Sequence, residues 1–74
     1  MSRLILTFPT LFKVLAADKL LRQQVSCRPT PTPQGLSSDI CGVSVELLDR
    51  SQLTRALALL KADGNPPSGQ HEVQ

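Results

Sequence analysis

The chain has 74 residues, a formal net charge of +2 and only two aromatic residues, Phe8 and Phe12. This length allows one small domain, close to the lower limit at which a core folds alone, and that core must be aliphatic. Lys and Arg are spread over both halves without a basic run or an aromatic platform, which excludes the usual footprint of a nucleic-acid-binding protein.

The first residues do not favour export or membrane insertion. The apolar run 4–6 is too short for the core of a signal peptide and far too short to span a bilayer. The two cysteines, Cys27 and Cys41, cannot form the dense disulfide framework of a small secreted domain. We therefore predict a cytoplasmic protein with reduced thiols and no membrane partner, although a transient Cys27–Cys41 pair stays an open alternative.

The first half of the chain predicts a strand and a helix. Residues 3–8 are aliphatic and β-branched and end at Pro9, which is typical of a buried strand. Thr10 is a suitable N-cap for a helix over 11–24, whose apolar residues share one face. On the other face, Asp18 and Arg22 are four residues apart and can form an ion pair.

An extended segment, a loop and a second strand follow. Residues 25–30 read as extended, and the prolines at 29, 31 and 33 lack N–H donors, so we place the segment at the margin of a sheet. Residues 34–40 are rich in turn-forming side chains and predict a loop. Apolar and polar residues alternate over 42–47, which predicts a half-buried strand.

The last third predicts a helix and a tail. Asp49 is a suitable helix cap, with Gln52 completing a pattern like a capping box, and Gly64 ends the helix. Residues 64–74 offer almost nothing to bury and predict a disordered tail after a single domain over 1–63. The fold class is therefore α+β, a small βαββα ferredoxin-like sandwich lacking the last strand. The missing strand would leave an open sheet edge, where a second copy could form a homodimer.

Five short motifs in a fixed order give the chain a resemblance to a known family. They are Phe8-Pro9-Thr10, Ala17-Asp18-Lys19-Leu20-Leu21, Pro31-Thr32-Pro33, Ser37-Ser38-Asp39 and Cys41-Gly42-Val43. In this order they resemble the selenium/sulfur carrier protein-like family, small bacterial proteins of unknown function. The resemblance covers roughly residues 3 to 60.

The resemblance implies a carrier without a bound cofactor, which accepts a sulfur or selenium atom on its loop cysteine, here Cys41. The atom would pass to or from sulfur- or selenium-handling enzymes, and the choice between the two elements stays open. A free thiol is mostly protonated at neutral pH. Backbone N–H groups before Gly42, the hydroxyls of Ser37 and Ser38, and Arg28 are the candidates for stabilising a thiolate at Cys41.

The sequence departs from the family pattern at Gln34, where the family commonly has Arg, and at Ile40, an extra residue before the cysteine. For Cys27 we favour a structural role, with a resolving thiol that captures a persulfide as the alternative. His71 is too distant from the cysteines for a zinc site, and no acid/base pair suggests an enzyme. The alternative function is a non-catalytic interaction or regulatory module with structural cysteines.

Overall fold

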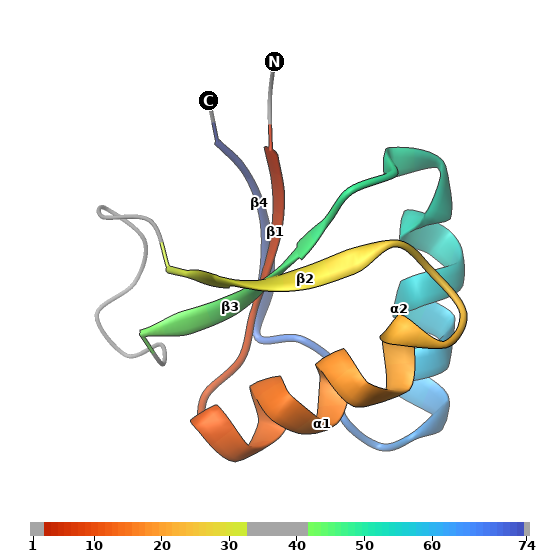
Figure 1. The fold of residues 1–74 in the computed structure, drawn as a ribbon. Coiled ribbons are helices and arrows are strands. Elements are labelled where there is room, and N and C mark those ends of the chain that lie inside the picture. Colours follow the sequence, from red (N-terminus) through yellow and green to blue (C-terminus); the bar gives the residue numbers. More distant parts are fainter. Residues whose placement is uncertain (1–2, 33–41, 74) are drawn as a thin grey trace.

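Residues 3–32 and 42–73 are described by the computed structural model and form one antiparallel sheet covered by two helices on the same side (Figure 1). The sheet order is β2-β3-β1-β4, with every neighbouring pair antiparallel. This arrangement confirms the predicted α+β, ferredoxin-like fold class. The elements are β1 (Arg3–Thr7), α1 (Leu11–Arg22), β2 (Cys27–Pro31), β3 (Val43–Leu47), the 3-10 turn η1 (Arg50–Gln52), α2 (Leu53–Ala62) and β4 (Gly69–Val73).

The fourth strand corrects the sequence prediction. Gly69–Val73 pairs with β1 along its whole length, from Thr7 opposite Gly69 to Arg3 opposite Val73. The expected absence of the last strand is therefore wrong, and so is the expected disorder of the tail over the residues of β4. The absent strand was expected to leave a sheet edge open to a second copy, and β4 fills this place beside β1.

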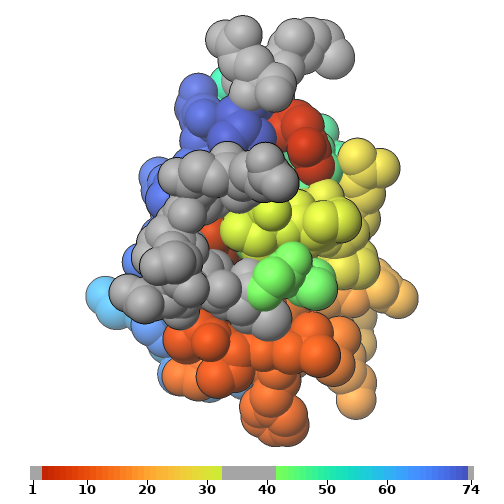
Figure 2. All heavy atoms as spheres, turned by 90° about the vertical axis from the view of Figure 1, so that its left-hand side faces the viewer, coloured from red at the N-terminus to blue at the C-terminus, as the bar shows by residue number. Residues whose placement is uncertain are grey.

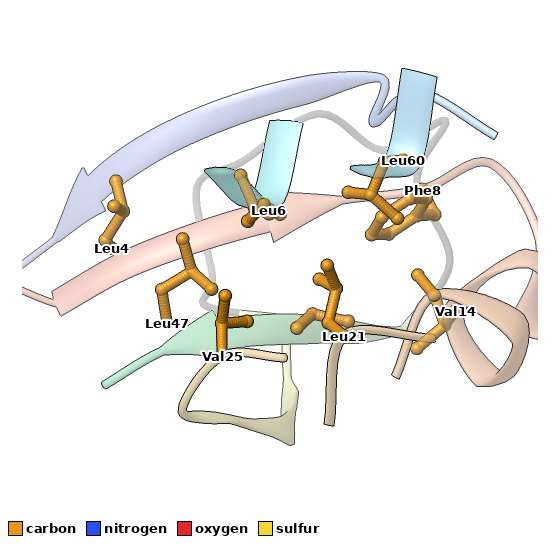
Figure 3. Packing of buried hydrophobic residues seen from close by; sticks show 11 residues of the cluster. Leu4, Leu6, Phe8, Val14, Leu21, Val25, Leu47 and Leu60 are labelled. Carbon is orange, nitrogen blue, oxygen red and sulfur yellow. The ribbon is translucent and has the colours of Figure 1, made fainter. Parts of the chain in front are cut away.

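The core lies between the sheet and the two helices (Figure 3). Strand alternation sends Leu4, Leu6 and Phe8 to the helix side, and Val45 and Leu47 on β3 do the same. From the helices, Val14, Ala17, Leu21, Ala56 and Leu60 complete the cluster. The core is aliphatic apart from Phe8, as the composition predicted.

Local capping accounts for where both helices begin and where α2 ends. The Thr10 hydroxyl accepts from the N–H of Lys13 at 3.2 Å, which confirms the predicted cap of α1. Asp49 caps η1, the turn that leads into α2, by accepting from the N–H of Ser51 at 3.0 Å. At the other end Gly64 has a φ of 74°, a left-handed conformation that glycine adopts without strain, and the chain turns back toward the sheet.

The pairing of β4 gives the first prediction. Deleting residues 69–74 should remove most of the roughly 5 kcal/mol expected for a domain of this size, because β1 loses a whole neighbouring strand. Urea unfolding followed by circular dichroism measures the change, with deletion of Gln74 alone as the control. An unchanged unfolding midpoint in the longer deletion would show that β4 contributes nothing to the fold.

Candidate functional site at the β2–β3 hairpin

Hydrogen bonds join the end of β2 to the start of β3, on either side of residues 33–41. The N–H of Thr32 donates to the carbonyl of Gly42 at 2.9 Å, and the hydroxyls of Thr32 and Ser44 lie 2.6 Å apart. Gly42 is exposed, and a Cβ built on it would meet no described atom within 4 Å. We call these three residues, Thr32, Gly42 and Ser44, the hairpin neck.

Several predicted site residues lie outside the described part of the chain. These are Cys41, Ser37 and Ser38, together with the two departures from the family pattern, Gln34 and Ile40. Their proposed roles stay predictions. What the structure does place is Gly42, which is bonded directly to Cys41, and the strands that lead to it.

The prolines of β2 sit where the sheet can tolerate them. β2 pairs on one side only, with β3, which confirms its predicted marginal position. Because the N–H of Thr32 points to β3, alternation turns the nitrogens of Pro29 and Pro31 to the outer edge, where no ladder bond is lost. The same prolines deny that edge to an added strand.

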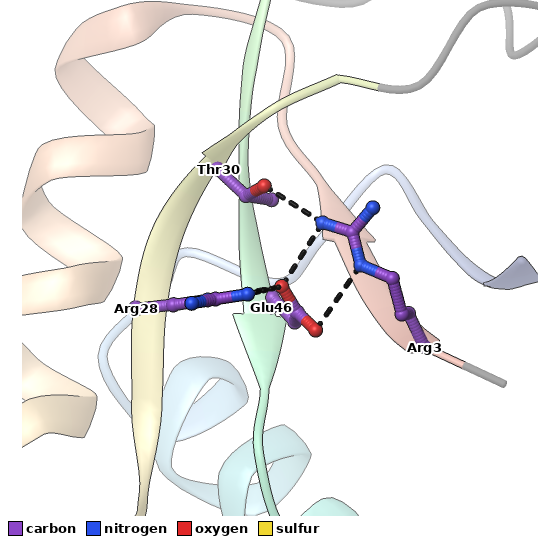
Figure 4. A network of polar contacts seen from close by, with 4 residues as sticks. All are labelled: Arg3, Arg28, Thr30 and Glu46. Atoms are coloured by element: carbon purple, nitrogen blue, oxygen red, sulfur yellow. Dashed lines mark hydrogen bonds and ion pairs between the residues drawn. The ribbon is translucent and has the colours of Figure 1, made fainter. Parts of the chain in front are cut away.

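A carboxylate with two arginines lies on the sheet face opposite the helices (Figure 4). Glu46 of β3, with only 7% of its side chain exposed, accepts from Arg3 Nε at 3.2 Å and Nη2 at 3.0 Å. It also accepts from Arg28 Nε at 3.1 Å. Arg3 Nη2 donates a further bond to the Thr30 hydroxyl at 2.9 Å. One carboxylate thus links β1, β2 and β3.

This cluster keeps Glu46 ionised. The hydrogen bonds from Arg3 lower the pKa of Glu46 most strongly, burial opposes them by raising it, and Arg28 adds to the lowering. Sequence reasoning missed Arg3, Thr30 and Glu46. The strand pattern placed Glu46 on the polar face, where a charged residue is ordinary, and its partner Arg3 is 43 residues away.

Arg28, a predicted support for the Cys41 thiolate, lies some distance along β2 from the hairpin neck. Its Cα is paired with that of Glu46, four residues along β3 from Gly42, or roughly 13 Å at the usual rise of a strand. Its guanidinium is held by the Glu46 carboxylate. The structure therefore brings Arg28 together with Arg3 and Glu46, and not with the hairpin neck.

Cys27 lies half-buried at the start of β2, packed against the core. Its Sγ faces Asp18 Oδ1 of α1 at 4.0 Å, a long and weak S–H···O contact, while Asp18 is also paired with Arg22 as predicted. Burial raises the pKa of the Cys27 thiol most, the Asp18 charge raises it further, and Arg22 lowers it. Cys27 is thus held as a neutral thiol, a poor nucleophile.

Cys27 is also far from the hairpin neck. Its Cα is paired with that of Leu47, five residues along β3 from Gly42, which corresponds to roughly 16 Å. Consecutive Cα atoms are about 3.8 Å apart, so the covalent bond to Gly42 cannot bring Cys41 across this distance. A disulfide needs its two Cα atoms about 4.4–6.8 Å apart. Pairing of Cys27 with Cys41 in one molecule would require β2 and β3 to separate.

The sequence was compared with families, with curated proteins and with solved structures. A family model described as "Putative Se/S carrier protein-like" matches residues 3–72. The chain belongs to this family. The other two comparisons, with curated proteins and with solved structures, found no match.

Two further findings concern the described part of this family member. Within residues 3–32 and 42–73, no three His, Cys, Asp or Glu side chains come together as a metal site. Neither helix in those ranges has the length and apolarity to cross a bilayer.

Replacing Glu46 by Gln should lower the free energy of unfolding by about 2 kcal/mol at pH 7, because two arginines lose an ionised partner. The folded-state pKa of Glu46 lies below its ordinary value of about 4.5, so its contribution is complete above that pH and is lost as the pH falls through the folded-state pKa. Urea unfolding between pH 7 and 3 should show that the difference in free energy of unfolding between wild type and E46Q becomes smaller as the pH falls. The control is Glu72→Gln, whose exposed pair with Arg50 should contribute under about 0.5 kcal/mol. A gap that persists unchanged at pH 3 would contradict this account.

The environment of Cys27 predicts how fast it is alkylated. In a Cys41→Ser background, Asp18→Asn should speed iodoacetamide labelling of Cys27 several-fold at pH 8, since the charge that raises its pKa is removed. Arg22→Gln should slow it, because Arg22 lowers that pKa. Mass spectrometry over time gives both rates. Equal rates in the two variants would show that these charges do not control the thiol.

Proposed function

We propose that this protein is a sulfur or selenium carrier in which Cys41 accepts the atom from one enzyme and delivers it to another. The observation that carries the proposal is membership of the carrier-like family across residues 3–72. The geometry of the described residues supports Cys41 as the working thiol, because Cys27 is held neutral beside Asp18.

The hairpin neck suits a thiol that must meet another protein. Gly42 is exposed and its surroundings are open among the described atoms, so the start of β3 lies at the surface of the molecule. The hydrogen bond from Thr32 to Gly42 holds the end of β2 and the start of β3 together at this point. A carrier of this kind supplies a defined anchor for the thiol and leaves selectivity to docking.

The transfer step needs no cofactor and no change in overall oxidation state. The Cys41 thiolate attacks the terminal sulfur of a persulfide on the donor. A new S–S bond forms at Cys41 as the S–S bond of the donor breaks, and the donor cysteine leaves as a thiolate. The terminal sulfur keeps its proton, so Cys41 becomes a persulfide. Selenium follows the same course, with the new bond formed between Cys41 sulfur and selenium.

Substitution of each cysteine by serine separates the two thiols. Cys41→Ser should fold normally and lose all persulfide label after treatment with glutathione persulfide, while Cys27→Ser should retain the label. Intact-protein mass spectrometry detects the added sulfur as a mass that dithiothreitol removes. A label that survives in Cys41→Ser and vanishes in Cys27→Ser would make Cys27 the acceptor and overturn the assignment.

The alternative function, a non-catalytic interaction module, gives a different result. If the cysteines only pack, neither thiol of the wild-type protein should take up sulfur from glutathione persulfide. Alkylation of both thiols would then leave the binding of a partner unchanged. Ser37 and Ser38 enter the carrier proposal only as predicted supports for the Cys41 thiolate.

A further inference from the structure

An apolar patch on α1 lies outside the core. Leu11, Phe12 and Leu15 are 51%, 81% and 56% exposed, although the helix already buries another face against the sheet. Leu11 and Leu15 are four residues apart and therefore neighbours on the helix surface, with Phe12 adjoining them. A cluster of large exposed apolar side chains in a chain this poor in aromatics marks an interaction surface.

The beginning of α1, which carries the patch, lies at the same end of the sheet as the beginning of β3, which carries the hairpin neck (Figure 1). Figure 2 shows the first part of α1, in orange-red, beside the start of β3, in green, on one face of the molecule. The two elements are in contact, and Figure 1 shows the beginning of α1 at the same end of the sheet as the beginning of β3. A protein seated on this patch would therefore lie at the end of the sheet where Gly42 leads into β3.

The charges around the patch define the occupant. Lys13 and Lys19 are exposed on α1, and the charge of Arg22 is matched by that of Asp18, the only acidic residue of the helix. The border of the patch is therefore cationic. Complementarity requires an apolar site with an acidic border on the partner.

The same charges and the size of the patch argue against a second copy of this chain. A twofold dimer through α1 would set the cationic border of one copy against that of the other. Three exposed side chains also fall well short of the roughly 800 Å² per partner that stable interfaces bury. A small contact of this kind suits an encounter that must end once an atom has been transferred.

We propose that Leu11, Phe12 and Leu15 form the docking surface for the enzyme that donates the atom to Cys41, and that this enzyme binds through an apolar site with an acidic border. The inference rests on the proposed carrier function and names the docking surface of its donor. Docking there holds the persulfide of the donor next to the hairpin neck, so the patch accelerates transfer without taking part in the chemistry.

The test compares a protein donor with a small one. The probe is a cysteine desulfurase, an enzyme that carries a cysteine persulfide, charged with ³⁵S; the small donor is glutathione persulfide. The double variant F12S/L15Q should lower kcat/KM for transfer from the desulfurase at least about tenfold, because both anchors of a small interface are lost. Loading by glutathione persulfide should be unchanged.

Two further variants serve as control and second test. Leu48→Ser removes a side chain that is 55% exposed but lies beyond the opposite end of β3, and it should leave both rates unchanged. Lys19→Glu reverses part of the cationic border while keeping the apolar patch, and it should slow transfer from the desulfurase, with the defect shrinking at high salt.

The outcomes separate the docking surface from the carrier function. If glutathione persulfide does not load Cys41, the carrier function itself fails. If it does, three results would overturn the docking surface. The first is an unchanged kcat/KM for desulfurase transfer in F12S/L15Q, and the second is an equal reduction in Leu48→Ser. The third is failure of the desulfurase to load the wild-type protein. A wild-type dimer in sedimentation that F12S/L15Q makes monomeric would also overturn it, since a second copy would then occupy the patch.

Discussion

The position of the hairpin neck depends on the Glu46 carboxylate. A carboxylate this deeply covered is tolerated only when cations and hydrogen bonds replace the lost water, and Arg3 and Arg28 do so from the two strands on either side. Because successive residues of a strand face opposite ways, a slip of one residue would send Glu46 into the aliphatic core and Val45 or Leu47 out of it. The ion pairs and the core therefore select the same register for β2, β3 and β1, and that register aligns Thr32 with Gly42.

How much of this fold the sequence predicts depends on whether the signal is local. The alternation of β3, the Thr10 cap and the stop at Gly64 are properties of a few adjacent residues, and all three predictions are confirmed. β4 was missed because Gly69–Val73 is mostly polar and has no apolar alternation. Its strand conformation follows from the backbone groups of β1, which need a partner on that side, and this is a long-range requirement.

In the candidate site, too, the sequence predicts the local features and misses the long-range contacts. The motif around Cys41 and Gly42 is readable in the sequence, but the neighbours of each side chain are not. Arg28 was expected to support the cysteine, and only the register of β2 against β3 reveals that Glu46 holds it. The environment of Cys27 was equally hidden, since Asp18 reaches it from a different element through the packing of α1 on β2.

The two cysteines illustrate how so small a fold can distinguish thiols. Cys27 is next to the core and to Asp18, and both features stabilise the protonated form, which protects it from alkylation and from sulfur transfer. A second reactive thiol close to a carried persulfide would discharge it as a disulfide, so a carrier benefits from a neutral and distant one. The roughly 16 Å between the start of β2 and Gly42 provides that separation. In the proposed carrier, the paired strands thus anchor the accepting thiol and also keep the other cysteine away from it.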